Sequence, residues 1–196
     1  ASMWTGYYHG MEHLGWGEAM VGHNLQYKML HEVAVTPELL SRYKVIILPQ
    51  MTLIDEPCRK AIETYVREGG TLVVTGETGM LDERGRPRPD FLLGELMNVR
   101  FVEMLHAPFD VAHRDETFTY APDRMFYQYG ARMLHVAIRD PKRSRVLVRF
   151  HRNSEAYSGV IESEYGKGKV YTVAAYFGVS NFELDLREGS KPLFKT

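Results

Sequence analysis

The sequence contains almost no cysteine. Cys58 is the single thiol in 196 residues, so the chain can form no internal disulfide, and a zinc site cannot rest on cysteine alone. Sparing use of cysteine is typical of proteins that fold in a reducing compartment, and we expect a cytoplasmic protein.

Long apolar runs and an excess of charge of one sign are also missing. No apolar stretch approaches the ~20 residues that span a bilayer, and the first residues lack the charged-then-apolar order of a signal peptide. The 24 basic and 25 acidic side chains leave a net charge of −1, so we expect neither nucleic acid nor a membrane as partner. One local group of basic residues is interpreted as a solvated face: Arg139, Lys142, Arg143, Arg145, Arg149 and Arg152.

The clearest element that is present is a helix over residues 55–68, DEPCRKAIETYVRE. Asp55 is a favourable N-cap, and Gly69 supplies the left-handed residue that ends a helix. Apolar side chains recur at the spacing of one helical face, beginning with Cys58. Cys58 is therefore predicted to be a buried structural thiol rather than a nucleophile.

Two short apolar runs, residues 44–49 and 71–75, flank this helix. They do not alternate with polar residues, which is typical of strands covered on both faces in a parallel sheet. Upstream, the sequence predicts a glycine-weakened helix over 11–22, a strand over 25–35, and a short helix over 36–43 capped by Thr36. The order predicts an open α/β sheet.

The chain opens with a helix where such a sheet usually opens with a strand. Residues 1–3 resemble a remnant of expression cloning, and we place one domain over residues 4–196 as a piece of a longer chain. Further on, residues 81–90 form a charged loop, after which Asp90 is expected to cap a helix over 91–99. Three strands follow, over 145–150, 156–165 and 169–177, and GKG at 166–168 is a hairpin signal between the last two.

The candidate ligand site lies where the two apolar strands end. Gln50 follows the first strand, and Glu77 and Thr78 follow the second. Ligands of open α/β sheets bind beyond the carboxyl ends of the strands, so these three side chains could bind a carbohydrate or another small molecule. The alternative interpretation is a turn in which Glu77 and Thr78 make only structural hydrogen bonds.

Other motifs in the sequence lack the surroundings that their chemistry needs. HGMEH at residues 9–13 matches an inverted zinc-protease pattern, but Gly10 weakens its helix and no third ligand stands out. The G-x-S-x-G elbow of hydrolases and a phosphate-binding loop are both missing. We therefore predict no catalytic residue, no metal and no cofactor.

Several segments together resemble a known family. They are Tyr43 before the strand that ends at Pro49, the helix that ends in GG before TLVVTGETG (71–79), the DERGRPRPDF loop (82–91), and YGKGKVYTVAAYFG (165–178). This pattern is similar to the class I glutamine amidotransferase-like domain of β-galactosidases, called the β-galactosidase trimerisation domain.

The resemblance implies a flavodoxin-like three-layer α/β sandwich, with a mostly parallel sheet and an antiparallel C-terminal extension. It implies a catalytic (β/α)8 barrel upstream in the same polypeptide, a glycoside hydrolase parent and a homo-oligomer. Active amidotransferases carry a nucleophilic cysteine after the strand that here ends before Glu77, so amidotransferase chemistry is not expected.

Three functions remain open from the sequence. The first is a non-catalytic accessory and oligomerisation domain of a glycoside hydrolase. The second is a carbohydrate or small-molecule binding module at the carboxyl edge of the sheet. The third is an independent hydrolase that uses Glu77 as its base.

Overall fold

A computed structural model describes residues 3–106, 110–113, 116–118, 132–152 and 154–179. Its main feature is a seven-stranded sheet with the strand order β1-β2-β9-β8-β7-β4-β5. The strands are β1 (Val45–Pro49), β2 (Thr71–Thr75), β4 (Asp110–His113), β5 (Glu116–Phe118), β7 (Ser144–Arg152), β8 (Glu155–Tyr165) and β9 (Gly168–Val173). A second, antiparallel sheet pairs β3 (Val99–His106) with β6 (Arg132–Ile138).

The centre of the large sheet is parallel, and its extension is antiparallel. β1 pairs with β2 in parallel, and β2 pairs with β9 in parallel. From β9 onward each neighbour is antiparallel. This confirms the predicted α/β class, the two parallel strands and the antiparallel C-terminal extension. The predicted hairpin is also confirmed, because Gly166 takes a positive φ of 59° between β8 and β9.

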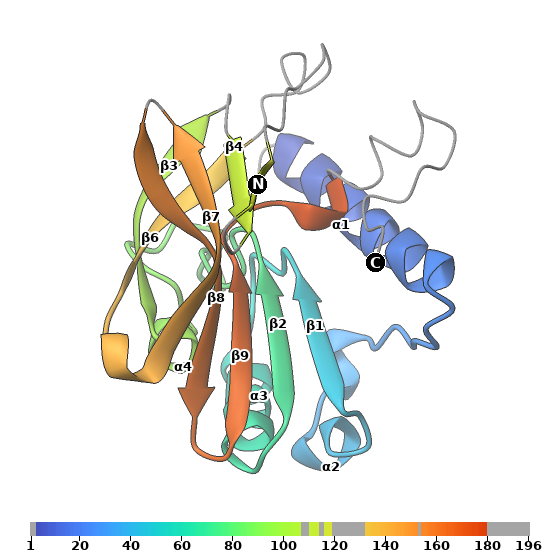
Figure 1. The fold of residues 1–196 in the computed structure, drawn as a ribbon. Helices are drawn as coiled ribbons and strands as arrows, with labels where there is room; N and C mark the ends of the chain where they lie inside the picture. Colours follow the sequence, from blue (N-terminus) through green and yellow to red (C-terminus); the bar gives the residue numbers. More distant parts are fainter. Residues whose placement is uncertain (1–2, 107–109, 114–115, 119–131, 153, 180–196) are drawn as a thin grey trace.

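The described residues also form helical segments. They are α1 (Met3–Gly22), η1 (Glu32–Ala34), α2 (Pro37–Leu40), α3 (Glu56–Arg67), α4 (Gly94–Met97) and η2 (Pro141–Arg143). Figure 1 shows α3 behind β2 and β9, with α1 beyond the carboxyl ends of the parallel strands. The prediction of α3 is confirmed: the Asp55 carboxylate accepts a hydrogen bond of 2.8 Å from the Cys58 amide.

Two predicted elements are wrong. Residues 25–35 do not form a strand: they include the short η1, and no strand in the described part of the chain pairs with them. The helix predicted over 91–99 is shorter in the structure and consists of α4 alone. It ends at Asn98, whose backbone takes the left-handed conformation. Asp90 does not cap it, because its Oδ1 accepts from the amides of Phe91 and Phe101, each at 2.8 Å, and so fixes the loop to β3.

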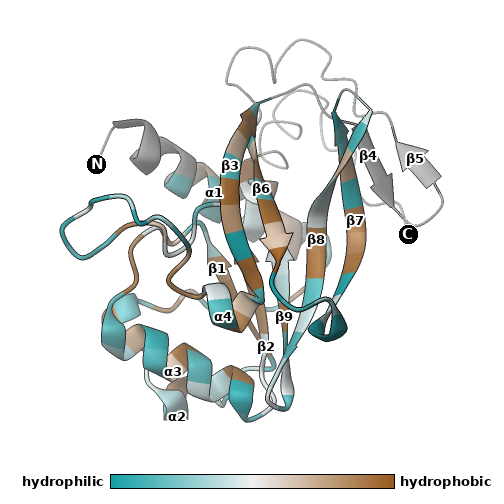
Figure 2. Ribbon diagram, turned by 90° about the vertical axis from the view of Figure 1, so that its left-hand side faces the viewer, coloured by the Kyte–Doolittle hydropathy of each residue, from teal (hydrophilic) through white to brown (hydrophobic). Residues whose placement is uncertain are grey.

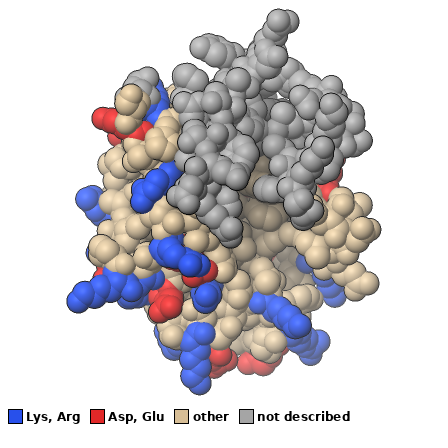
Figure 3. Space-filling view, viewed as in Figure 1, with Lys and Arg blue, Asp and Glu red and all other residues tan. Residues whose placement is uncertain are grey.

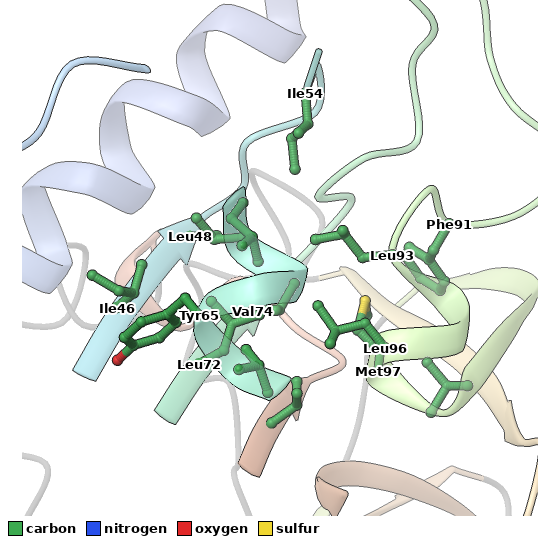
Figure 4. Close-up of a cluster of buried hydrophobic side chains, with 14 of the residues drawn as sticks. Ile46, Leu48, Ile54, Tyr65, Leu72, Val74, Phe91, Leu93, Leu96 and Met97 are labelled. Carbon is green, nitrogen blue, oxygen red and sulfur yellow. The ribbon is translucent and has the colours of Figure 1, made fainter. Parts of the chain in front are cut away.

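The core lies on one face of the large sheet. The apolar stripe of α3 is fully buried there against Leu72 and Val74 of β2. Figure 4 shows side chains from β1, β2, α3 and the region of α4 converging in this core. Figure 2 shows the same division along the ribbon, with apolar strands inside and hydrophilic turns on the outside of α3. This packing places the carboxyl ends of β1 and β2 side by side.

The opposite face of the sheet is less covered. On β1 and β2 the side chains that point away from α3 are only partly buried, and Val45 is 49% exposed. Figure 3, which views this face, shows acidic and basic side chains interspersed around it. Of the basic group predicted to be a solvated face, Arg139 pairs with Asp90 at 2.6 Å and Arg145 with Glu162 at 3.4 Å. These charges are balanced within the domain.

Candidate ligand site at the carboxyl edge of the sheet

The structure brings the three predicted site residues to one edge. Pro49 and Thr75 are register partners at the ends of β1 and β2. Gln50 follows the first directly, and Glu77 and Thr78 follow the second after Gly76. Parallel pairing of the two strands therefore makes these residues neighbours, although the environments of their side chains differ.

Thr78 has a structural role. It is fully buried, and its hydroxyl lies 2.7 Å from the carbonyl oxygen of Thr75 and 3.2 Å from that of Leu48. The same oxygen accepts a hydrogen bond of 3.2 Å from the amide of Met51. Since these partners are backbone groups of the two strand ends, the hydroxyl fastens the turn to the sheet.

Glu77 is held by a tyrosine. The Tyr176 hydroxyl donates a hydrogen bond of 2.5 Å to its carboxylate. Gly76 precedes it with a φ of 56°, and a Cβ at Gly76 would lie within 3.3 Å of both the Tyr176 ring and the Gln50 side chain. Glycine is thus required here both by the backbone and by packing. The position that would carry a nucleophile instead carries an acid paired with a phenol.

Gln50 is the one predicted residue with unused hydrogen-bonding groups. It is 1% exposed, and its backbone takes a left-handed φ of 48°, which is uncommon outside glycine. Its amide N–H donates to Thr75 Oγ1 at 3.2 Å, and its carbonyl oxygen lies 3.0 Å from His9 Nδ1. Among the described residues, neither Oε1 nor Nε2 of the side chain has a partner. A buried amide without partners is costly, so this group favours a polar ligand.

Glu12 completes the edge, and the sequence analysis did not single it out. This residue of α1 is fully buried. Its carboxylate accepts hydrogen bonds from the Thr75 hydroxyl at 2.7 Å, the Val179 amide at 3.0 Å and the Trp16 indole N–H at 3.2 Å. Burial raises the pKa of Glu12, and these hydrogen bonds offset part of that rise. Glu12 therefore joins α1 to β2 and to the segment after β9.

The HGMEH motif thus supplies a structural contact. The rings of His9 and His13 stand edge to face with their centroids 4.4 Å apart. Burial, together with the nearby His9, lowers the pKa of His13. Within the described ranges, no group of three or more His, Cys, Asp or Glu side chains could hold a metal ion. The sequence does contain a signal that Glu12 is a contact residue. Residues 9, 12, 13 and 16 are spaced three or four apart, which places them on one face of a helix.

Among the residues that the structure describes, the site offers hydrogen-bonding groups but no paired nucleophile and base. The sulfur of Cys58 is buried in α3, and burial, with the charges of Asp55 and Glu32, raises its pKa to about 11. The partner that the structure gives Glu77 is a tyrosine rather than a histidine. An amide, a carboxylate and hydroxyls at one edge are groups that recognise neutral polar molecules.

These features define an α/β domain whose carboxyl edge is held by hydrogen bonds, and comparison with known families gives its class. The chain belongs to the β-galactosidase trimerisation domain family, whose model matches residues 9–187. The predicted family is therefore confirmed, and with it the non-catalytic accessory type of domain. None of the helices in the described residues combines the length and the apolar character needed to cross a lipid bilayer.

The chain is similar to known β-galactosidases. It is 26% identical to β-galactosidase GanA of Bacillus subtilis (strain 168) in an alignment over 168 residues, and the match covers 81% of this chain and 23% of GanA. The chain thus spans less than a quarter of the length of that curated relative.

Solved structures share the fold. The β-galactosidase of Bacillus circulans sp. alkalophilus aligns with a TM-score of 0.68 at 20% identity, over 96% of this chain and 28% of that one. The β-galactosidase of the haloarchaeon Halorubrum lacusprofundi aligns with a TM-score of 0.66 at 16% identity, over 92% of this chain and 26% of that one. A cytoplasmic protein of Salmonella typhimurium LT2 aligns with a TM-score of 0.59 at 15% identity, over 92% of this chain and 87% of that one.

Proposed function

We propose that this chain is the domain through which copies of a β-galactosidase-like glycoside hydrolase assemble. The observation that carries the proposal is the match of the trimerisation-domain family over residues 9–187. The parent polypeptide carries a catalytic (β/α)8 barrel, and it works in the cytoplasm as a homo-oligomer of three copies. The similarity to GanA, which covers only 23% of that enzyme, supports a larger catalytic parent.

The carboxyl edge of the sheet supports a role in assembly over a role in catalysis. Glycoside hydrolysis needs two carboxyl groups that flank one bond at a set separation. At this edge Glu12 is fully buried and bound to Thr75 and Val179, while Glu77 is bound to Tyr176. Both acids are occupied by contacts that hold the domain together.

Sedimentation of the complete polypeptide, with and without residues 9–187, tests the assembly proposal. We expect three copies per particle for the complete polypeptide and one copy after the deletion. Circular dichroism of the shortened polypeptide shows whether the remaining part is folded. An unchanged number of copies in a folded deletion variant would contradict the proposal.

A second function, carbohydrate binding at the carboxyl edge, is favoured by one observation. The buried side-chain amide of Gln50 has both its polar atoms unpaired among the described residues. A sugar hydroxyl both donates and accepts, so it could satisfy the oxygen and the nitrogen of an amide at once. Glu77 and the Tyr176 hydroxyl lie beside the same glycine and would line the same site.

Titration calorimetry with galactose and a panel of other monosaccharides tests this second function. We expect heat of binding from the unaltered chain, none from Gln50→Leu, and weakened binding in Glu77→Gln. Gln26→Leu is the matched control, because residue 26 is exposed and lies away from the edge. An absence of heat with every sugar, or binding that survives Gln50→Leu, would remove Gln50 from any sugar site.

A further inference from the structure

β1 lies at the edge of the large sheet but has the sequence of an interior strand. Its five residues, VIILP, carry no charge. Edge strands usually carry charges, bulges or a covering segment that blocks further pairing. Ile46 and Leu48 are buried on the core face, and Val45 and Ile47 are apolar on the other face. Apolar side chains on both faces are typical of a strand with neighbours on both sides.

The free edge of β1 has backbone groups ready for pairing. The Thr71 amide lies 3.4 Å from the carbonyl oxygen of Lys44, so the backbone groups of residue 44 face β2. Because orientation alternates along a strand, those of residues 46 and 48 also face β2, and those of Val45 and Ile47 face outward. In the part of the chain that the structure describes, β2 is the only strand paired with β1.

A second strand-like segment, residues 25–31, pairs with no strand among the described residues. Within residues 25–31, three alternate side chains are large apolar groups that are exposed to solvent: Leu25 is 55% exposed, Tyr27 53% and Met29 69%. A repeat of two residues is the pattern of a strand. In Figure 1 this segment runs from the end of α1 down to α2, on the side where β1 is the last strand.

We propose that an extended segment of the same polypeptide, from outside residues 1–196, pairs with the free edge of β1. It would hydrogen-bond the outward groups of Val45 and Ile47 and bring apolar side chains against the 25–31 segment. The longer parent that we propose can supply such a segment, since this chain covers only 23% of the length of the relative GanA. A tethered strand also meets the edge at a high effective concentration.

Hydrogen exchange at residues 45–47 tests the proposal, in this chain alone and in the complete polypeptide. In this chain the outward amides of Val45 and Ile47 exchange quickly, whereas the Ile46 amide, which faces β2, exchanges slowly and serves as the internal control. In the complete polypeptide we expect exchange at Val45 and Ile47 to slow by about tenfold or more. Equal rates in both contexts would overturn the proposal.

Two other occupants of the edge have distinct outcomes. Slow exchange in this chain alone would show that its own residues close the edge. Slowing that grows with the concentration of this chain would show that a second copy pairs there. Either result contradicts a strand from elsewhere in the polypeptide.

A pair of substitutions gives an independent readout. Val45→Pro removes one outward N–H at the first residue of the strand, where proline is tolerated, and Val45→Thr keeps that N–H. We expect Val45→Pro to lower the urea midpoint more in the complete polypeptide than in this chain. Val45→Thr should change the urea midpoint by the same amount in the complete polypeptide and in this chain. An equal effect of Val45→Pro in both would argue against pairing.

Pairing at β1 rests on the proposed longer parent, but different results would reject the strand pairing and the assembly role. Fast exchange at Val45 and Ile47 in a complete polypeptide that still forms three copies would reject the strand alone. A polypeptide that protects both amides yet sediments as one copy would reject the assembly role alone.

Discussion

Glu12 is the residue that best shows how this domain is held together. Its carboxylate is fully buried and accepts hydrogen bonds from Thr75 of β2 and from the amide of Val179, after β9. Those partners lie 63 and 167 residues away in the sequence. A single buried acid thus joins the first helix, the central parallel strand and the segment that follows the last strand.

Removal of this carboxylate should weaken the domain. Glu12→Ala would leave the Thr75 hydroxyl and the Val179 amide unpaired inside the protein, at a cost of roughly 2–4 kcal/mol in the free energy of unfolding. Glu12→Gln keeps an acceptor oxygen and should cost less than the alanine variant. Urea unfolding of the three proteins gives the comparison, and equal midpoints for all three would show that the contact contributes little.

The stability of the domain should also depend on pH through Glu12. Burial raises its pKa above the ordinary value of 4.5, so the folded state binds this proton more tightly than the unfolded state. The stabilisation is fully present below pH 4.5 and is lost as the pH rises through the raised pKa. We expect the unfolding free energy of the unaltered protein to fall over that range relative to Glu12→Gln, and parallel pH profiles would contradict this.

Cys58 should not react in the folded protein. Its side chain is buried on α3, and burial, with the charges of Asp55 and Glu32, raises its pKa to about 11. Because the thiolate is the reactive form, a thiol reagent at neutral pH should label the folded chain far more slowly than the chain in denaturant. Equal labelling rates would mean that α3 does not pack as described.

At the scale of elements, α1 approaches the segment that follows β9 through glycine. A Cβ at Gly15 would lie 1.7 Å from the carbonyl oxygen of Gly178, and a Cβ at Gly178 would lie 2.0 Å from that of Glu12. Neither backbone can move away without breaking the hydrogen bonds of Glu12. The glycines that weaken α1 as an isolated helix are therefore what allow it to dock.

Two glycines of the same helix should respond in opposite ways to alanine. Gly15→Ala should destabilise the domain by about 1–3 kcal/mol, because the methyl group meets backbone atoms. Gly10→Ala has nothing within 4 Å of the added carbon. It should stabilise the helix by roughly 0.5–1 kcal/mol. Thermal unfolding of both variants tests the contact, and a neutral Gly15→Ala would contradict it.

The elements that the sequence predicted well are those specified by local signals. The cap at Asp55 and the apolar stripe from Cys58 predicted α3, and the continuous apolar runs predicted β1 and β2. The strand predicted over 25–35 failed although Leu25, Tyr27 and Met29 alternate as in a strand. Pairing depends on a neighbour, and the sequence pattern of one strand does not reveal whether its neighbour is there.

The candidate site was predictable only in part, for a similar reason. Gln50, Glu77 and Thr78 could be placed at one edge because they follow two strands that pair in parallel. The hydroxyl of Thr78 donates to backbone carbonyl groups, and Tyr176 donates to Glu77. Both contacts join residues that the fold brings together, so the local sequence does not reveal them. Glu12 was hidden because its motif matched a metal pattern while its partners lie far along the chain.

At the scale of the whole molecule, the domain has the fold of an enzyme family's accessory part and uses its acids to hold itself together. The family match covers residues 9–187. Its core is buried on one face of the sheet, its carboxyl edge is hydrogen-bonded, and β1 places an uncharged strand at the edge of the sheet. The role that we propose for this domain is the assembly of three copies of the parent polypeptide.

The most direct test is the mass of the complete polypeptide in solution, measured by light scattering during size-exclusion chromatography. We expect a single species of three times the mass of one polypeptide at micromolar concentration. A species with the mass of one polypeptide across that concentration range would contradict it.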